Sequence, residues 1–275
     1  MRAAGLALAW MLATAAPPVR AALFGRFSSH VGSGNRASAI TLRKRLHVNT
    51  LITEPGTMEI EWGGAFSTSG NFTLPSAIKY TPEGTHPWWG RTEFSASFDT
   101  LNSVVQFDNR TTQFSDRLTL AANCVIHDGD RFDLAFAPSA SFLLRGEEGQ
   151  RFGGTAIGRY DWGRNSAGAT LTWTAATAPS DTNPAGTFDL GAGYGRRLSA
   201  SGVLGHLTAH ANWLYEKSTG IGSTVSLFEG VEYQITETVA VDFSGQHFGV
   251  GSGAVDHQVS IGLTVNTGRL RRASH

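Results

Sequence analysis

The histidines of the C-terminal half are the first candidates for metal binding or catalysis, because some of them are closely spaced in the sequence. His206 and His210 are four residues apart in a segment where apolar and polar residues alternate. On a strand this spacing corresponds to about 13 Å, so the two imidazoles cannot bind one metal ion without a third partner. His247 and Ser252 lie close together in a glycine-rich stretch, but hydrolysis needs a base, a nucleophile and an orienting group within mutual reach. No such triplet is present locally, so we predict no catalytic, cofactor or metal site.

Charged residues form a second candidate set, because they occupy alternate positions in runs whose other positions are apolar. Alternate side chains of a strand face opposite sides of a sheet, so these residues would share one inward face. Two interpretations stay open. An acidic interior would favour cations or weakly basic solutes, whereas hydrogen bonds and ion pairs could simply fill a narrow interior. The set comprises Glu59, Glu61, Lys79, Glu93, Asp99, Asp133, Arg159, Asp161, Asp189, His206, His210, Glu232 and Asp242.

A period of two residues runs from Met58 towards the C-terminus in about twelve segments. The segment 169–175 is a clear case, with Leu171 and Trp173 on one face and threonines on the other. Ile157 and Glu229 break the pattern, because Ile157 falls on the polar face and Glu229 on the apolar face. A β-bulge, or a position near a rim, would explain Glu229. The pattern indicates antiparallel strands with one apolar face.

The composition favours a sheet with one face in lipid. Charged residues make up 16% of the chain, whereas ordinary soluble domains have roughly 25%. Runs of about 10 residues suit tilted strands that cross a bilayer, and aromatic residues recur near the ends of the runs. Open sheet edges cannot be satisfied in lipid. We therefore predict an all-β fold, an antiparallel transmembrane β-barrel of about 12 strands, with ten or fourteen strands as alternatives.

Charge and cysteine content exclude several classes of protein. The formal net charge is zero, which gives no electrostatic argument for binding nucleic acid. Cys124 is the single cysteine, so neither an internal disulfide nor a multi-cysteine metal site can form.

Three segments are expected along the chain. Residues 1–21 have the short basic start, apolar stretch and small residues of a signal peptide. The apolar stretch, Ala3–Ala16, is too short and too rich in alanine for a membrane helix. Residues 22–57 form a polar lead with a basic run at 43–45. We interpret this lead as a periplasmic extension or partial plug, with a disordered tail as the alternative. Residues 58–270 form the barrel, and the expected location is the bacterial outer membrane.

The lengths of the connections alternate along most of the barrel. Short turns are expected at 127–131, 164–166 and 236–238, and longer connections at 100–116, 144–150, 176–184 and 216–223. Outer-membrane barrels have short periplasmic turns and longer extracellular loops. The long connection 81–90 and the short hairpin 67–71 depart from this alternation.

Several stretches resemble the outer-membrane family annotated for the MetA pathway of phenol degradation. They are Glu54–Trp62, Pro75–Pro82, Gly230–Ile235 and Val259–Val265. The resemblance implies a barrel that moves small, often hydrophobic or aromatic, molecules, and it supplies no catalytic residues. Barrels of this kind usually end on an aromatic residue, whereas this chain ends in the basic tail 271–275.

The predicted function is therefore a channel or transporter for small molecules, and not an enzyme. Its expected partners are outer-membrane lipids, a small-molecule solute and the barrel-assembly machinery. Two alternatives stay open. One is a structural or adhesive barrel without transport, and the other is a lipid-modifying enzyme that would use His247 on the outer face.

Overall fold

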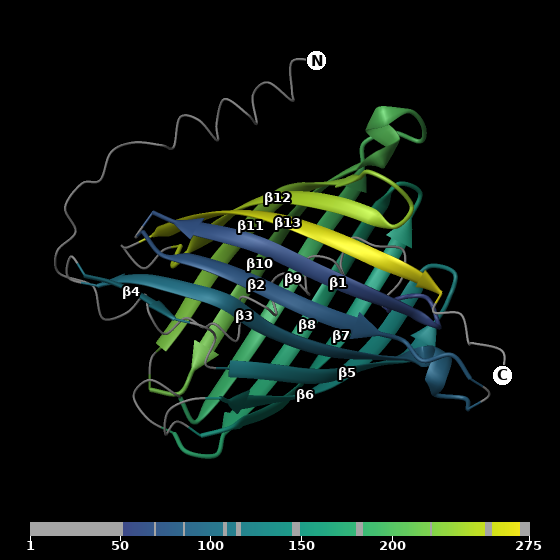
Figure 1. Cartoon of the computed structure of the whole chain (residues 1–275). Coiled ribbons are helices and arrows are strands. Elements are labelled where there is room, and N and C mark those ends of the chain that lie inside the picture. The colour runs from purple at the N-terminus through teal and green to yellow at the C-terminus, as the bar shows by residue number, and fades with distance from the viewer. Residues whose placement is uncertain are drawn as a thin grey trace.

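The computed structural model describes residues 52–269, apart from 69, 85, 107–108, 114–116, 145–148, 180–183, 221 and 251–254. The expected signal peptide and most of the expected extension at 22–57 lie outside the described residues. Within the described residues nearly all regular structure is strand (Figure 1). Among them, no helix is long and apolar enough to span a membrane.

Thirteen strands and two short 3-10 turns follow one another along the described chain. The strands are β1 (Thr57–Ser67), β2 (Phe72–Tyr80), β3 (Thr92–Gln106), β4 (Asn109–Gln113), β5 (Arg117–Asp128), β6 (Phe132–Leu143), β7 (Arg151–Trp162), β8 (Asn165–Ala176), β9 (Gly186–Arg197), β10 (Leu207–Ser218), β11 (Gly222–Gln234), β12 (Val239–Phe248) and β13 (Asp256–Arg269). The turns are η1 (Trp89–Arg91) and η2 (Val203–His206).

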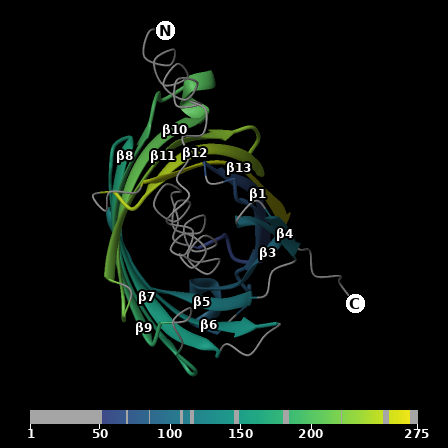
Figure 2. The ribbon, with the colours of Figure 1, turned by 90° about the vertical axis from the view of Figure 1, so that its left-hand side faces the viewer.

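Twelve of the strands form a closed antiparallel barrel. Each strand pairs with the next one along the chain, β3 pairs with β5, and β13 returns to pair with β1. The view in Figure 2 shows the strands arranged as a ring. β4 pairs with the far end of β3 and extends that strand as a hairpin. The predicted strand count is confirmed, and part of the expected connection 100–116 is this hairpin.

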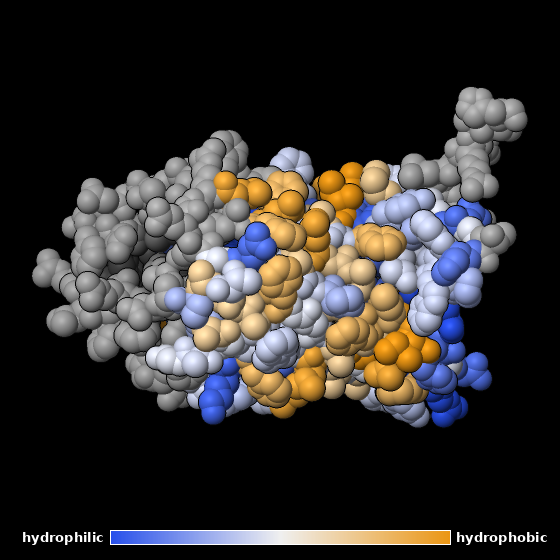
Figure 3. Space-filling model, turned by 90° about the horizontal axis from the view of Figure 1, so that it is seen from below, coloured by the Kyte–Doolittle hydropathy of each residue, from blue (hydrophilic) through white to orange (hydrophobic). Residues whose placement is uncertain are grey.

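The two faces of the barrel wall differ as the periodicity predicts. On β8, Leu171 is 45% and Trp173 is 58% exposed, whereas Thr170, the residue directly before Leu171, is 4% exposed. In a closed single wall, the exposed row faces outwards and the buried row faces the interior. Hydrophobic side chains cover much of the wall visible in Figure 3, and hydrophilic ones gather at its right-hand end. The apolar outer face matches the lipid contact that membrane barrels require.

Aromatic side chains meet near both ends of the wall. At the end that carries η1, the Trp162 ring contacts those of Tyr160 and Tyr194, with centroids 5.6 and 6.2 Å away. At the opposite end, the rings of Phe66 and Phe72 stack at 4.5 Å. Such aromatic belts are typical of the two interfaces of a bilayer.

The two exceptions to the periodicity have different explanations. Ile157 does face the interior, where it is 1% exposed and packs with Val125 and Ala135. Glu229 faces outwards on an unbroken register between β10 and β12, so the bulge suggested for it is wrong. The register instead shifts at β1, β2 and β5.

The end of the barrel that carries η1 also carries most of the short connections. The β5–β6, β7–β8 and β11–β12 turns lie there, as expected. Two longer connections share this end and contain η1 and η2 (Figure 1). The connection 198–206, which contains η2, is a third departure from the alternation, in addition to 81–90 and 67–71.

Candidate functional site: the inner wall of the barrel

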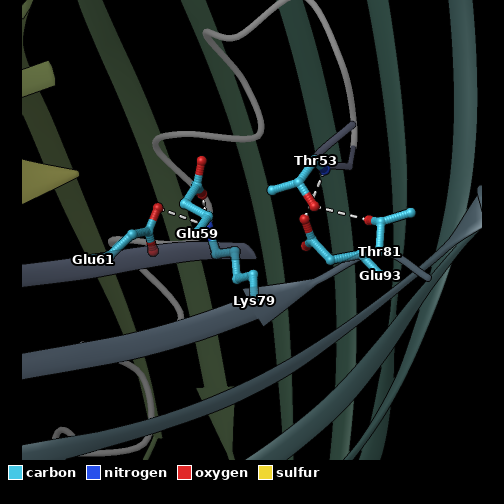
Figure 4. Close-up of polar contacts among 6 residues, drawn as sticks. All are labelled: Thr53, Glu59, Glu61, Lys79, Thr81 and Glu93. Carbon is cyan, nitrogen blue, oxygen red and sulfur yellow. Dashed lines mark hydrogen bonds and ion pairs between the residues drawn. The ribbon is translucent and has the colours of Figure 1, made fainter. Parts of the chain in front are cut away.

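A buried lysine joins two glutamates on the inner wall (Figure 4). Glu59 and Glu61 are two residues apart on β1, so their side chains point to the same face. Lys79 lies directly opposite Glu59 on β2. Its Nζ donates to Glu61 Oε1 at 2.6 Å and to Glu59 Oε1 at 3.3 Å. All three side chains are at least nine-tenths buried, so this is an internal ion-pair cluster.

The chain just before β1 is attached to the same inner wall. The backbone N–H of Thr53 donates to Glu93 Oε2 at 2.8 Å, and the Thr53 and Thr81 hydroxyls lie 2.8 Å apart (Figure 4). The Gly56 N–H donates to the Thr81 carbonyl at 2.7 Å. Ile52 packs against the apolar cluster of Val125, Ala135 and Ile157. The last residues of the expected extension therefore line the interior at the end that carries η1.

A second ion pair lies on β7, again at that end. Arg159 is 2% exposed, and its guanidinium contacts Asp161 Oδ2 at 2.7 Å. Asp133 on β6 lies directly opposite Arg159 and accepts a hydrogen bond from the Gly129 N–H at 3.3 Å. The arginine therefore lies between two carboxylates, one on its own strand and one on the neighbouring strand.

Two pairs of acidic residues face each other across adjacent strands. Asp189 on β9 lies opposite Glu216 on β10, and Glu232 on β11 lies opposite Asp242 on β12. Like charges in directly opposite positions destabilise a sheet. Each pair therefore places two carboxylates side by side on the inner wall.

Most of the residues predicted to face inwards are buried in the wall of the barrel. Those less than a tenth exposed are Glu59, Glu61, Lys79, Glu93, Asp133, Arg159, Asp189 and His210. Asp161, Glu232 and Asp242 are half-buried. Asp99 lies on β3 opposite Pro75, and its side chain lies outside the described residues.

His206 is a correction to the sequence prediction. It ends the turn η2, is exposed, and packs edge-on against Tyr233, so it does not face inwards from a strand. The alternation at 207–215 extends back to residue 206 in the sequence, but the chain turns before β10 begins. Glycines at 202 and 205 are the signal that could have placed this turn.

Three further inward residues were not on the predicted set. Glu216, Arg117 and Arg151 lie at or near strand ends, and Arg151 donates to the hydroxyls of Thr174 and Thr187 at 3.1 and 2.7 Å. Their alternate positions in the runs were available in the sequence. Because they lie next to loops, the sequence does not show whether they belong to the strand or to the loop.

Acidic groups outnumber basic ones on the described inner wall. The Asp and Glu residues include Glu59, Glu61, Glu93, Asp128, Asp133, Asp161, Asp189, Glu216, Glu232, Asp242 and Asp256, and the Lys and Arg residues include Lys79, Arg117, Arg151, Arg159 and Arg197. In the part of the chain that the structure describes, no group of three His, Cys, Asp or Glu residues is arranged to bind a metal ion.

Two of the three groups that a serine hydrolase needs, a histidine base and a carboxylate that orients it, lie together on the outer face. His247 contacts Glu229 through Nε2, at 3.2 Å, which is how a catalytic base is oriented. Its other ring nitrogen, however, faces His257 at 2.7 Å, where a nucleophile would have to lie. Ser252 lies outside the described residues.

Comparison with known proteins identifies the fold class. No protein-family profile and no curated protein matches the sequence. The structure is similar to the COG4313 outer membrane channel from Pseudomonas putida F1, with a TM-score of 0.55 and 9% identity over 78% of this chain and 96% of that one. It is also similar to the KdgM and NanC porins, each with a TM-score of 0.54 over 75% of this chain and 98% of the other, at 10% and 11% identity.

The chain therefore has the fold of outer-membrane β-barrel channels. Identities this low establish the fold alone, and the resemblance to the MetA-pathway family is not confirmed. The similar structures are porins and channels rather than enzymes.

Proposed function

We propose that this protein is a channel of the bacterial outer membrane that passes small solutes and prefers cations and weakly basic molecules. The observation that carries the proposal is the contrast between the two faces of one closed wall. The outer face is apolar along the strands, and the inner face is polar with more carboxylates than basic groups.

The charge distribution supports the preference for cations. Lys79 and Arg159 are each next to two carboxylates, so neither offers an isolated positive charge to an anion. The Glu232–Asp242 pair, in contrast, places two carboxylates face to face. Charged side chains that line a pore select ions because solutes of opposite sign are attracted and those of like sign are repelled.

The resemblance to the MetA-pathway family supports solutes that have an apolar part, such as small aromatic or aliphatic amines. The apolar cluster of Val125, Ala135 and Ile157 on the inner wall does not add to this support, because Ile52 packs against it and its members are at most 6% exposed.

Single-channel recording tests the proposal. The mature chain, refolded and inserted in a planar bilayer between unequal KCl solutions, should conduct and show a reversal potential of the sign that K⁺ selectivity gives. A double variant, Glu232→Gln with Asp242→Asn, should move the reversal potential towards zero. Glu229→Gln on the outer face of the same barrel is the matched control and should leave it unchanged.

Two results would overturn the proposal at different levels. A folded protein without conductance would exclude a channel and would support the structural or adhesive barrel. Conductance with preference for Cl⁻ would retain the channel and exclude the assignment of cationic solutes.

A further inference from the structure

The entry segment, residues 52–56, covers a place on the inner wall where a carboxylate lies beside an apolar row. The row consists of one side chain each from β5, β6 and β7: Val125, Ala135 and Ile157. Ile52 packs against this row. The backbone N–H of the next residue, Thr53, donates to Glu93 Oε2 at 2.8 Å (Figure 4). One apolar side chain and one N–H donor of the entry segment are therefore bound side by side.

The strand registers explain why the carboxylate and the apolar row are neighbours. Val125 lies directly opposite Ala135, and Ala135 directly opposite Ile157, so the row is continuous across three strands. Glu93 on β3 lies directly opposite Asn123 on β5. Asn123 and Val125 are two residues apart on the same face, which corresponds to about 7 Å along the strand. Glu93 is thus one strand away from the row and a short distance along it.

Burial determines what can occupy this place. With the entry segment bound, Glu93 is 2% exposed and the members of the row are at most 6% exposed. A carboxylate at this depth is unfavourable without hydrogen-bond donors, and an apolar row is unfavourable in contact with water. A suitable occupant therefore combines a donor with an apolar group, as Thr53 and Ile52 do together.

The entry segment is attached to the wall by local contacts that can be exchanged for others. Besides the bond to Glu93, the hydroxyls of Thr53 and Thr81 lie 2.8 Å apart, and the Gly56 N–H donates to the Thr81 carbonyl at 2.7 Å. Ile52 itself is half-buried. Single hydrogen bonds contribute little net free energy, because water or another partner replaces them. Such a segment can leave the wall while the paired strands stay folded.

We propose that the place covered by Ile52 and Thr53 is a binding site for small primary amines that carry an apolar group, and that the entry segment competes with the solute for it. The ammonium group takes the place of the Thr53 N–H at Glu93, and the alkyl or aromatic group takes the place of Ile52 on the row. An ammonium group forms a stronger, charge-assisted hydrogen bond with a carboxylate than a neutral N–H does. The solute can therefore displace the segment. This inference rests on the proposed function for its class of solute and assigns that class a site.

The site lies at the end of the barrel that carries η1. Glu93 is the second residue of β3, which directly follows η1, and Thr81 directly follows β2. The entry segment leads into β1 at the same end. Binding of an amine would thus move the entry segment away from the wall at this mouth of the barrel and would leave the strand pairs intact.

Titration with isoamylammonium chloride tests the proposal, on the isotope-labelled chain from residue 22 onwards, refolded in detergent micelles. The amide resonances of Thr53 and Gly56 should shift along a saturable curve, because both N–H groups leave their acceptors. Methylammonium lacks the apolar group, and isoamyl alcohol lacks the charge. Each should need a concentration higher by at least about tenfold for the same shift.

Three variants separate the parts of the site. Ile52→Ala keeps the site but weakens the attachment of its competitor. It should lower the apparent dissociation constant of isoamylammonium about three- to tenfold, because a competitor reduces apparent affinity by the fraction of molecules in which the site is open. Glu93→Gln should raise this constant by about tenfold or more. Glu229→Gln, on the outer face, is the matched control and should leave it unchanged. The heat-modifiable gel shift of each variant reports folding separately from binding.

Each part of the proposal has a result that overturns it. An apparent dissociation constant that is equal in the natural chain and in Ile52→Ala would overturn the competition. Equal binding of isoamylammonium and methylammonium, or equal binding by the natural chain and Glu93→Gln, would overturn the site. Binding in micelles does not require conduction. A barrel that conducts cations without binding isoamylammonium here would thus overturn this inference and leave the channel, and a barrel that binds without conducting would do the reverse.

Discussion

Removal of the Lys79 charge provides a sharp test of the inner-wall cluster. Lys79→Met keeps a long unbranched side chain but removes the cation between Glu59 and Glu61. The two carboxylates are 6% and 3% exposed, so little water reaches them to replace the lost partner. They would also repel each other, because they are on the same face of β1 only two residues apart.

The expected loss follows from the burial of the cluster. Removing one partner of a buried ion pair typically costs about 3–5 kcal/mol, whereas exposed pairs contribute about 0–1 kcal/mol. All three side chains here are at least nine-tenths buried, so the larger range applies. Replacing all three groups by neutral ones of similar size (Glu59→Gln, Glu61→Gln, Lys79→Met) should recover most of the loss, because no uncompensated charge remains.

Urea unfolding of the refolded barrel in lipid vesicles measures both effects. The folded fraction can be followed by the heat-modifiable shift, and the free energy of unfolding compared among the natural chain, the single variant and the triple variant. A loss below about 1 kcal/mol for Lys79→Met would refute the burial argument. A triple variant no more stable than the single variant would show that uncompensated charge is not the cause.

Three more predictions concern the wall and its entrance. Leu171→Arg on the lipid face should destabilise the folded barrel by about 2–4 kcal/mol in vesicles, whereas Thr172→Arg on the inner face of β8 should be tolerated. Equal losses of unfolding free energy in the two variants would contradict the assignment of the two faces. At Gly153 an added Cβ would overlap a backbone carbonyl oxygen of β8, but at Gly158 the nearest atom is 3.9 Å away. In urea titrations Gly153→Ala should therefore lower the free energy of unfolding by about 1–3 kcal/mol, and Gly158→Ala should lower it much less. The reverse order would disprove the close approach of Gly153 to the backbone of β8. Thr53→Pro removes the N–H that donates to a buried carboxylate of β3, so amide hydrogen exchange around residue 56 should become faster, on the order of 10–100-fold. Thr53→Ser keeps this N–H and should leave the exchange rate unchanged. Unchanged exchange in the proline variant would show that this contact does not fix the segment.

The fold could be predicted from the sequence because a barrel wall has two chemically different faces. Each strand repeats the contrast that Leu171 and Thr170 show, so the count of about twelve strands rests on many independent segments. The same parity places Glu59, Lys79 and Asp189 on the inner wall without any knowledge of their partners. Which of these residues form pairs depends on register, and register depends on the lengths of the turns.

The parts that the sequence did not predict depend on contacts between distant segments. Glu229 breaks the apolar face for a reason that lies on two other strands, at His247 and His257. Ile157 on the inner wall is explained by Val125 and by Ile52 from the chain before β1. Periodicity within one strand contains no information on such neighbours.

Solute flux into liposomes tests the central claim most directly. Liposomes that contain the refolded chain from residue 22 onwards should swell in isotonic solutions of small solutes. An organic cation such as arginine should enter faster than an anion of similar size such as glutamate. This order follows from the acidic inner wall within a closed apolar barrel. Liposomes that contain the folded barrel but admit no solute, or that admit glutamate faster, would contradict the account.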